Sequence, residues 1–147
     1  MCHEVKLELI FLLPIFLPLL TSIFLFLNKK LFNELITNFF TLNGAILAFA
    51  IAAYSFITLG LDKFNPVNVE LFQWISNPDI SIGFTLDGLS GIMLILVTGL
   101  SFVIQLFSTS YMAKDENYCN YFVYFNFFVF SMLLLVMSSN FLVMFFG

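Results

Sequence analysis

Residues 88–113 read GLSGIMLILVTGLSFVIQLFSTSYMA, a stretch without a single charged side chain. About 20 apolar residues in an α-helix cross the ~30 Å hydrocarbon core of a bilayer, so this stretch is long enough to span a membrane. Asp87 stands immediately before it, where a carboxylate can accept hydrogen bonds from the free N–H groups of a helix start. The stretch therefore predicts a transmembrane helix with Asp87 as its N-cap.

Three more uncharged stretches lie on either side of this helix. Residues 9–27 and 35–61 precede it, and residues 117–147 follow it with a polar break at 138–140. We expect helices over residues 9–27, 35–61, 88–113 and 119–137, with residues 141–147 as the truncated start of another. The expected fold is an all-α polytopic membrane protein with about four transmembrane helices and the opening of a fifth.

The composition agrees with a membrane protein and excludes several other classes. Of 147 residues, 61% are hydrophobic and 10% are charged, whereas soluble domains carry about 25% charged residues. Five Lys, no Arg and a net charge of −4 exclude a nucleic-acid binder, because nothing neutralises phosphates. Cys2 and Cys119 are far apart and His3 is the single histidine, so the sequence predicts neither a disulfide framework nor a metal site.

The acidic segment between the second and third helices has a different periodicity. Apolar and polar residues alternate over 67–71 and again over 80–86, on either side of Asn77, Pro78 and Asp79. Alternation with period two around a turn predicts a β-hairpin, and a change of phase near Leu71 and Phe72 predicts a bulge. The expected organisation is residues 1–61 with two helices, 62–86 with the hairpin, and 87–147 with the remaining helices.

The distribution of lysines predicts the orientation. Lys29 and Lys30 lie in the first connection, and positive residues stay on the cytoplasmic or matrix side. We therefore expect residues 28–34 and 109–118 inside, and the N-terminus and an external β-hairpin outside.

The predicted spans hold no ionisable side chain at their centres. Such residues build proton relays and ion pathways, so the sequence predicts no catalytic, cofactor-binding or metal-binding residue in this chain. The polar residues of the spans are neutral, and we expect them to form hydrogen bonds between helices: Thr98, Gln105, Asn126 and Ser131. Gly44, Ala48 and Ala52 share one helix face, which fits either close helix packing or plain helix propensity.

Three short motifs carry a resemblance to a known family. They are the stretch FTLDGLS at 84–90, the stretch STSYM at 108–112 with Asp115, and the aromatic run YFVYFNFF at 121–128. Together they resemble the antiporter-like subunits of respiratory complex I (NADH–quinone oxidoreductase), in particular chain L, also called chain 5. The large subunit of multisubunit sodium/proton antiporters is similar in the same segment.

The resemblance implies the N-terminal part of a proton-translocating subunit. In the family the proton-transfer Glu follows the position of Gly147 and the functional Lys residues come later, so a scaffold portion lacking them is expected here. Asp87, Gly88, Ser90 and Asn126 are then structural candidates. Flavin, iron–sulfur clusters, NADH oxidation and ubiquinone reduction are expected in other subunits.

The resemblance also implies partners and a location. The partners are other membrane-arm subunits of complex I and the lipid bilayer, without nucleic acid, in the bacterial cytoplasmic (inner) membrane or the mitochondrial inner membrane. Two alternatives stay open: a fragment of a sodium/proton antiporter subunit, and a non-catalytic truncated membrane protein. Whether the chain counts as part of an enzyme also stays open.

Overall fold

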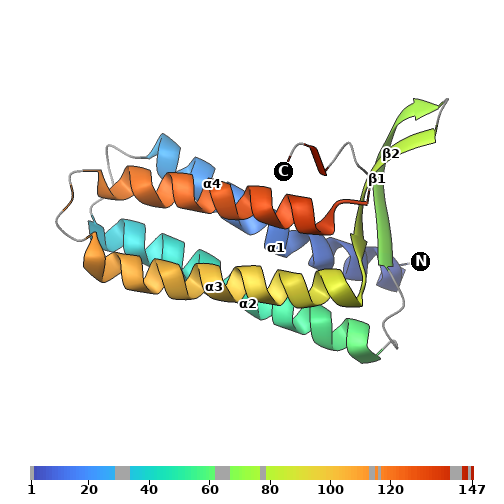
Figure 1. The fold of residues 1–147 in the computed structure, drawn as a ribbon, viewed down its shortest axis with the longest axis horizontal. Coiled ribbons are helices and arrows are strands. Elements are labelled where there is room, and N and C mark those ends of the chain that lie inside the picture. The colour runs from blue at the N-terminus through green and yellow to red at the C-terminus, as the bar shows by residue number, and fades with distance from the viewer. Residues whose placement is uncertain are drawn as a thin grey trace.

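The computed structural model is a bundle of four long helices with a two-stranded hairpin at one end (Figure 1). It describes residues 2–28, 34–61, 67–76, 79–112, 115, 117–139, 144, 145 and 147. The elements, in chain order, are α1 (Cys2–Leu27), α2 (Glu34–Leu61), β1 (Val67–Ser76), β2 (Asp79–Leu86), α3 (Gly88–Tyr111) and α4 (Tyr118–Met137).

The helix boundaries follow the uncharged stretches closely, except at the start of α1. Residues 9–27 were expected to be helical, and α1 begins earlier, at Cys2. Charge shows where a helix leaves the hydrocarbon core, but a helix can continue into the polar region beyond it. The polar break at 138–140 also marks the end of a helix. Helix α4 ends at Met137, because the backbone of Ser138 is extended, with a ψ angle of 129°. Most of the expected fifth helix lies outside the described residues.

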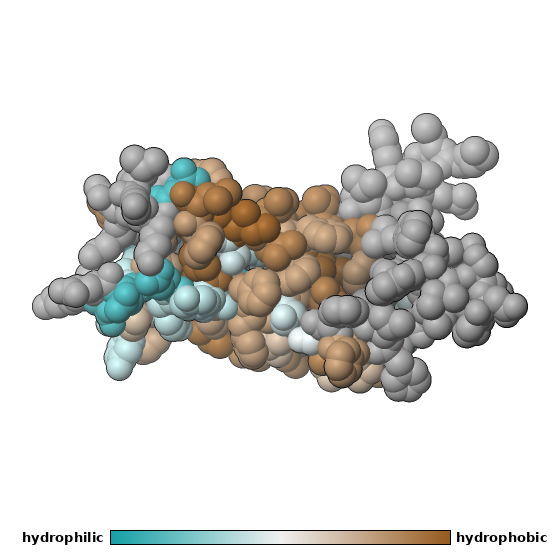
Figure 2. Space-filling model, turned by 90° about the horizontal axis from the view of Figure 1, so that it is seen from above, coloured by the Kyte–Doolittle hydropathy of each residue, from teal (hydrophilic) through white to brown (hydrophobic). Residues whose placement is uncertain are grey.

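Three described helical stretches are long and apolar enough to cross a membrane: Leu35–Thr58, Gly88–Tyr111 and Tyr118–Met137. A shorter apolar stretch, Leu12–Leu27, belongs to α1. The described chain is therefore a helical membrane protein with three candidate spans and one shorter apolar helix. Figure 2 shows the corresponding hydrophobic band along the bundle, with hydrophilic residues gathered at the end where α1 connects to α2 and α3 to α4.

The helices form a closed ring in cross-section. Helix α1 packs against α2 and α4, and α3 packs against the same two helices from the other side. Small residues lie where these helices approach closely. Ala48 and Ala52 are buried, and a Cβ added to Gly44 would lie 2.7 Å from Cγ2 of Thr21. Of the two interpretations of the small-residue face, the structure supports close packing.

The hairpin pairs β1 and β2 in antiparallel fashion, from Val67 opposite Leu86 to Ser76 opposite Asp79. A register shift between Glu70 and Phe72 confirms the predicted bulge near Leu71. A second shift between Gln73 and Ile75 was not predicted. The predicted turn residues Asn77 and Pro78 lie outside the described part of the chain.

Candidate functional site

The N-terminal end of α3 is the first of two polar centres in the described structure. Asp87 has extended backbone angles, and its Oδ1 accepts a hydrogen bond of 2.7 Å from the backbone N–H of Ser90. This hydrogen bond is the main reason why the pKa of Asp87 lies below its ordinary value. The N-cap that the sequence predicts at Asp87 is therefore present, and Gly88 follows it as the first residue of α3.

The same end of α3 is joined to α4 and to the hairpin. The backbone N–H of Ser139 donates to the carbonyl of Gly83 at 3.2 Å, and Phe84 forms an isolated antiparallel bridge with Ser138. Oγ of Ser90 approaches the carbonyl oxygen of Val136 at 3.4 Å, a long contact for a hydroxyl donor. The geometry of this corner is structural: it fixes where the hairpin leaves the bundle.

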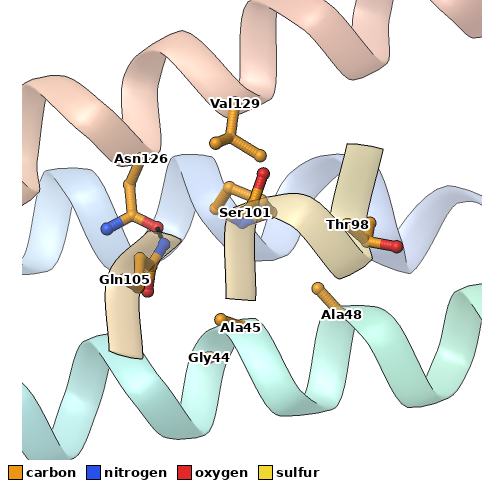
Figure 3. A pocket seen from close by; sticks show the side chains of 9 residues that line it. Gly44, Ala45, Ala48, Thr98, Ser101, Gln105, Asn126 and Val129 are labelled. Atoms are coloured by element: carbon orange, nitrogen blue, oxygen red, sulfur yellow. Dashed lines mark hydrogen bonds between the residues drawn. The ribbon is translucent and has the colours of Figure 1, made fainter. Parts of the chain in front are cut away.

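The second polar centre lies inside the bundle, between α3 and α4. Nε2 of Gln105 donates to Oδ1 of Asn126 at 3.1 Å, and Nδ2 of Asn126 donates to the carbonyl of Phe122 at 2.9 Å (Figure 3). Gln105 is 1% exposed and Asn126 is 3% exposed. The predicted interhelical role of both residues is confirmed, since each amide bonds to the other helix.

The four structural candidates do not form one site. Asp87, Gly88 and Ser90 lie together at the hairpin end, whereas Asn126 pairs with Gln105, 17 residues further along α3 than Gly88. At 1.5 Å per residue this separation is about 25 Å. The interhelical bond expected for Thr98 is not found among the described residues. Its hydroxyl donates to the carbonyl of Leu94 in its own helix at 2.7 Å.

Sequence reasoning missed three further contacts between helices. Oγ of Ser22 donates to the carbonyl of Val123 at 2.9 Å, Oγ of Ser108 and the Tyr121 hydroxyl lie 3.0 Å apart, and the Tyr118 hydroxyl donates to Oδ1 of Asn38. One signal was available, because Ser101, Gln105 and Ser108 recur every three or four residues and so share a face of α3.

Within the described residues, no group of three or more His, Cys, Asp or Glu side chains could hold a metal ion. The buried polar side chains that the structure describes are all neutral: Ser22, Thr37, Thr41, Ser55, Thr98, Ser101, Gln105, Ser108 and Asn126. Such groups can orient helices and bind neutral polar molecules. Without a titrating partner they do not hold a transferable charge.

Comparison with known proteins agrees with the family suggested by the motifs. Residues 72–122 match the family described as "NADH-Ubiquinone oxidoreductase (complex I), chain 5 N-terminus". NADH-quinone oxidoreductase subunit L of Escherichia coli (strain K12) is 34% identical over 141 residues, covering 92% of this chain and 22% of the relative. NADH-ubiquinone oxidoreductase chain 5 of Trichophyton rubrum is 36% identical over 143 residues, covering 93% of this chain and 21% of the relative.

A solved structure shares the fold. One chain of the membrane-bound sulfane sulfur reductase (MBS), an archaeal respiratory membrane complex, superposes with a TM-score of 0.80 and 20% identity. The match covers 94% of this chain and 27% of that chain. By the coverages given for the two sequence relatives, the chain spans about a fifth of the length of the curated relatives it matches. With the motifs and the bundle geometry, these similarities place the chain in the complex I subunit L/chain 5 family, of which it carries the antiporter-like N-terminal region.

Proposed function

We propose that the chain is the scaffold portion of a proton-translocating, antiporter-like subunit of NADH:quinone oxidoreductase. Its membership in the subunit L/chain 5 family is the observation that carries this proposal. The described interior supports a scaffold role, because its buried polar side chains are neutral and, apart from Thr37, bond to neighbouring helices or to their own backbone. Ionisable groups for proton transfer would then come from other parts of the assembly.

The hairpin and the lysines suggest how this scaffold is oriented. The N-terminus and the hairpin lie at one end of the bundle, and the α1–α2 and α3–α4 connections lie at the other (Figure 1). Lys29 and Lys30 belong to the first connection, so that end faces the cytoplasm or matrix. The hairpin is then external, and its strands are available to neighbouring membrane-arm subunits.

In this proposal the redox chemistry belongs to partner subunits. Flavin and iron–sulfur clusters are held there, and the chain itself contributes helices in the bacterial cytoplasmic or mitochondrial inner membrane. The relatives named above are subunits of NADH–quinone and NADH–ubiquinone oxidoreductases. The chain would assemble in the same way with other subunits and with lipid.

Native purification tests the proposal. The chain is tagged in its source membrane and isolated in a mild detergent, and the preparation is assayed for bound flavin, iron–sulfur signals and NADH:quinone activity. All three should co-purify with the tag, and a matched tag on an unrelated membrane protein should recover none of them. Recovery without any redox centre, together with sodium-dependent proton exchange in vesicles, would support the sodium/proton antiporter instead. Recovery with neither activity would support a non-catalytic membrane protein.

A further inference from the structure

A small cavity lies beside the Gln105–Asn126 pair and is lined by residues of all four helices. Pro18 comes from α1, three small residues from α2, three polar residues from α3, and two residues from α4 (Figure 3). The lining residues are Pro18, Gly44, Ala45, Ala48, Thr98, Ser101, Gln105, Asn126 and Val129. The volume open to a water-sized molecule is about 10 Å³, which is at the lower limit for one water, ~10–15 Å³.

One oxygen on the wall of this cavity has an unmet hydrogen-bonding requirement. Oε1 of Gln105 has no hydrogen-bond partner among the described residues, although the side chain is 1% exposed. The amide cannot simply be turned around. Asn126 donates its Nδ2 to Phe122 and presents Oδ1, so Gln105 must direct Nε2 toward it. Figure 3 accordingly shows the Gln105 oxygen turned away from Asn126.

Leaving a buried carbonyl oxygen unpaired is costly, so a partner for Oε1 is favoured. The neighbouring hydroxyls cannot donate to it, because Ser101 donates to the carbonyl of Val97 at 2.6 Å and Thr98 donates to that of Leu94 at 2.7 Å. Both hydroxyls still have lone pairs that can accept a hydrogen bond. Neither hydroxyl is therefore free to donate to Oε1, and the wall still offers several acceptors.

We propose that this cavity is a binding site for a single internal water molecule. The water donates one hydrogen bond to Oε1 of Gln105 and the other to an acceptor on the wall, the Ser101 hydroxyl or Oδ1 of Asn126. It thereby completes a neutral hydrogen-bonded centre that ties α3 and α4 together opposite the small residues of α2. Gly44, Ala45 and Ala48 form the α2 wall of the cavity, and their small size leaves room for the water.

Solid-state NMR of the full chain in lipid bilayers tests the water directly. The chain contains two glutamines, Gln73 and Gln105, so side-chain ¹⁵N-glutamine labelling gives two amide signals, and loss of one in Gln105→Met assigns it. We expect magnetisation transfer from water protons to the Gln105 amide, and loss of that transfer in Ala48→Val, which fills the cavity. Absence of transfer in the unmodified chain, or its persistence in Ala48→Val by way of the hydroxyls, would overturn the proposal.

A double-mutant cycle gives an independent test by stability. Ala48→Val displaces the water and leaves Oε1 unpaired, so it should lower the midpoint of thermal unfolding by about 2–4 °C or more. In a background that carries both Gln105→Met and Asn126→Leu, neither amide oxygen is present to be left unpaired, and Ala48→Val should be neutral or stabilising. Equal effects of Ala48→Val in both backgrounds would mean a dry cavity and would contradict the proposal.

Discussion

The two ends of the bundle are held together by different kinds of contact. At the hairpin end, Phe84 and Leu86 of β2 are buried among apolar residues of the helices, and backbone atoms of the hairpin pair with the end of α4. Toward the connection end, side chains bond from one helix to another, as in the pairs Gln105–Asn126 and Ser108–Tyr121. The hairpin is therefore held to the bundle by apolar packing and backbone pairing, whereas hydrogen bonds between side chains join the helices toward the connection end.

The difference follows from the surroundings of each end. Where the chain leaves the bundle as a strand, extended backbone is available to pair with another segment and strand side chains can enter the core. Between membrane helices the backbone is already bonded within each helix, so side chains must supply the specific contacts. Apolar packing should therefore contribute most of the stability at the hairpin end. At the connection end, many weak hydrogen bonds between side chains should set the register of the helices.

The largest effect is expected at the hairpin end, from Leu86→Ala. Leu86 is 2% exposed and belongs to the cluster that includes Leu94, Leu133 and Met137. Truncating a buried leucine leaves a cavity and costs about 2–5 kcal/mol. Unfolding in mixed detergent micelles would measure it.

The matched control for that variant is Leu89→Ala. Leu89 is 68% exposed, so its truncation should change the free energy of unfolding by much less. If both variants lost the same stability, the hairpin strand would not be an integral part of the core, and the contrast between the two ends would fail.

Close approach of α1 and α2 gives the second effect. A Cβ added by Gly44→Ala would lie 2.7 Å from Cγ2 of Thr21, whose hydroxyl is bonded to the carbonyl of Pro18 at 2.9 Å. The overlap should exceed the helix-propensity gain of about 1 kcal/mol, for a net loss of about 1–2 kcal/mol. Thermal unfolding measures the change. Thr21→Ser removes the methyl group that the new Cβ would meet, so in that background Gly44→Ala should raise the stability instead of lowering it. If Gly44→Ala still lowered the stability there, the strain would lie elsewhere.

The Asp87 cap gives a third, pH-dependent effect. Asp87→Ala should cost about 1 kcal/mol at pH 7 by removing the bond to Ser90. Because the native pKa of Asp87 is lowered, its contribution is complete above the unfolded pKa of about 4 and is lost as pH falls through the native value. Asp87→Asn keeps a capping oxygen without titration, so its stability relative to the unmodified chain should rise between pH 5 and pH 3. Parallel pH profiles for the two chains would contradict a titrating cap.

The helices could be predicted from the sequence because the bilayer imposes a length on uncharged segments. Residues 88–113 and 119–137 gave α3 and α4 to within two residues at each end. The Asp87 cap and the bulge near Leu71 could also be predicted, since both depend on neighbours in the sequence. Local rules of this kind need no knowledge of the tertiary structure.

The pairing between helices could be predicted only in part. Spacing along α3 shows that Ser101, Gln105 and Ser108 share a face, but it does not show which helix lies opposite. Gln105 and Asn126 were each expected to form a hydrogen bond between helices. The bond from Ser22 to the carbonyl of Val123 could not be predicted from the sequence. A backbone carbonyl is present at every residue, so its partner is decided by the packing angle of two helices rather than by residue type.

The smallest effect is expected at the polar end, from the bond between Ser108 and Tyr121. Their hydroxyls lie 3.0 Å apart, and Ser108→Ala and Tyr121→Phe each remove one hydroxyl with little change of shape. Hydrogen bonds between membrane helices average about 0.6 kcal/mol in double-mutant cycles, because unfolded helices in the membrane also find partners. The coupling energy from thermal unfolding of the two single variants and the double variant should therefore be near that value. Tyr111→Phe, on a side chain that is 78% exposed, should show no coupling to Ser108→Ala. A Ser108–Tyr121 coupling as large as the Leu86→Ala loss would mean that single polar contacts, rather than their number, hold this end of the bundle.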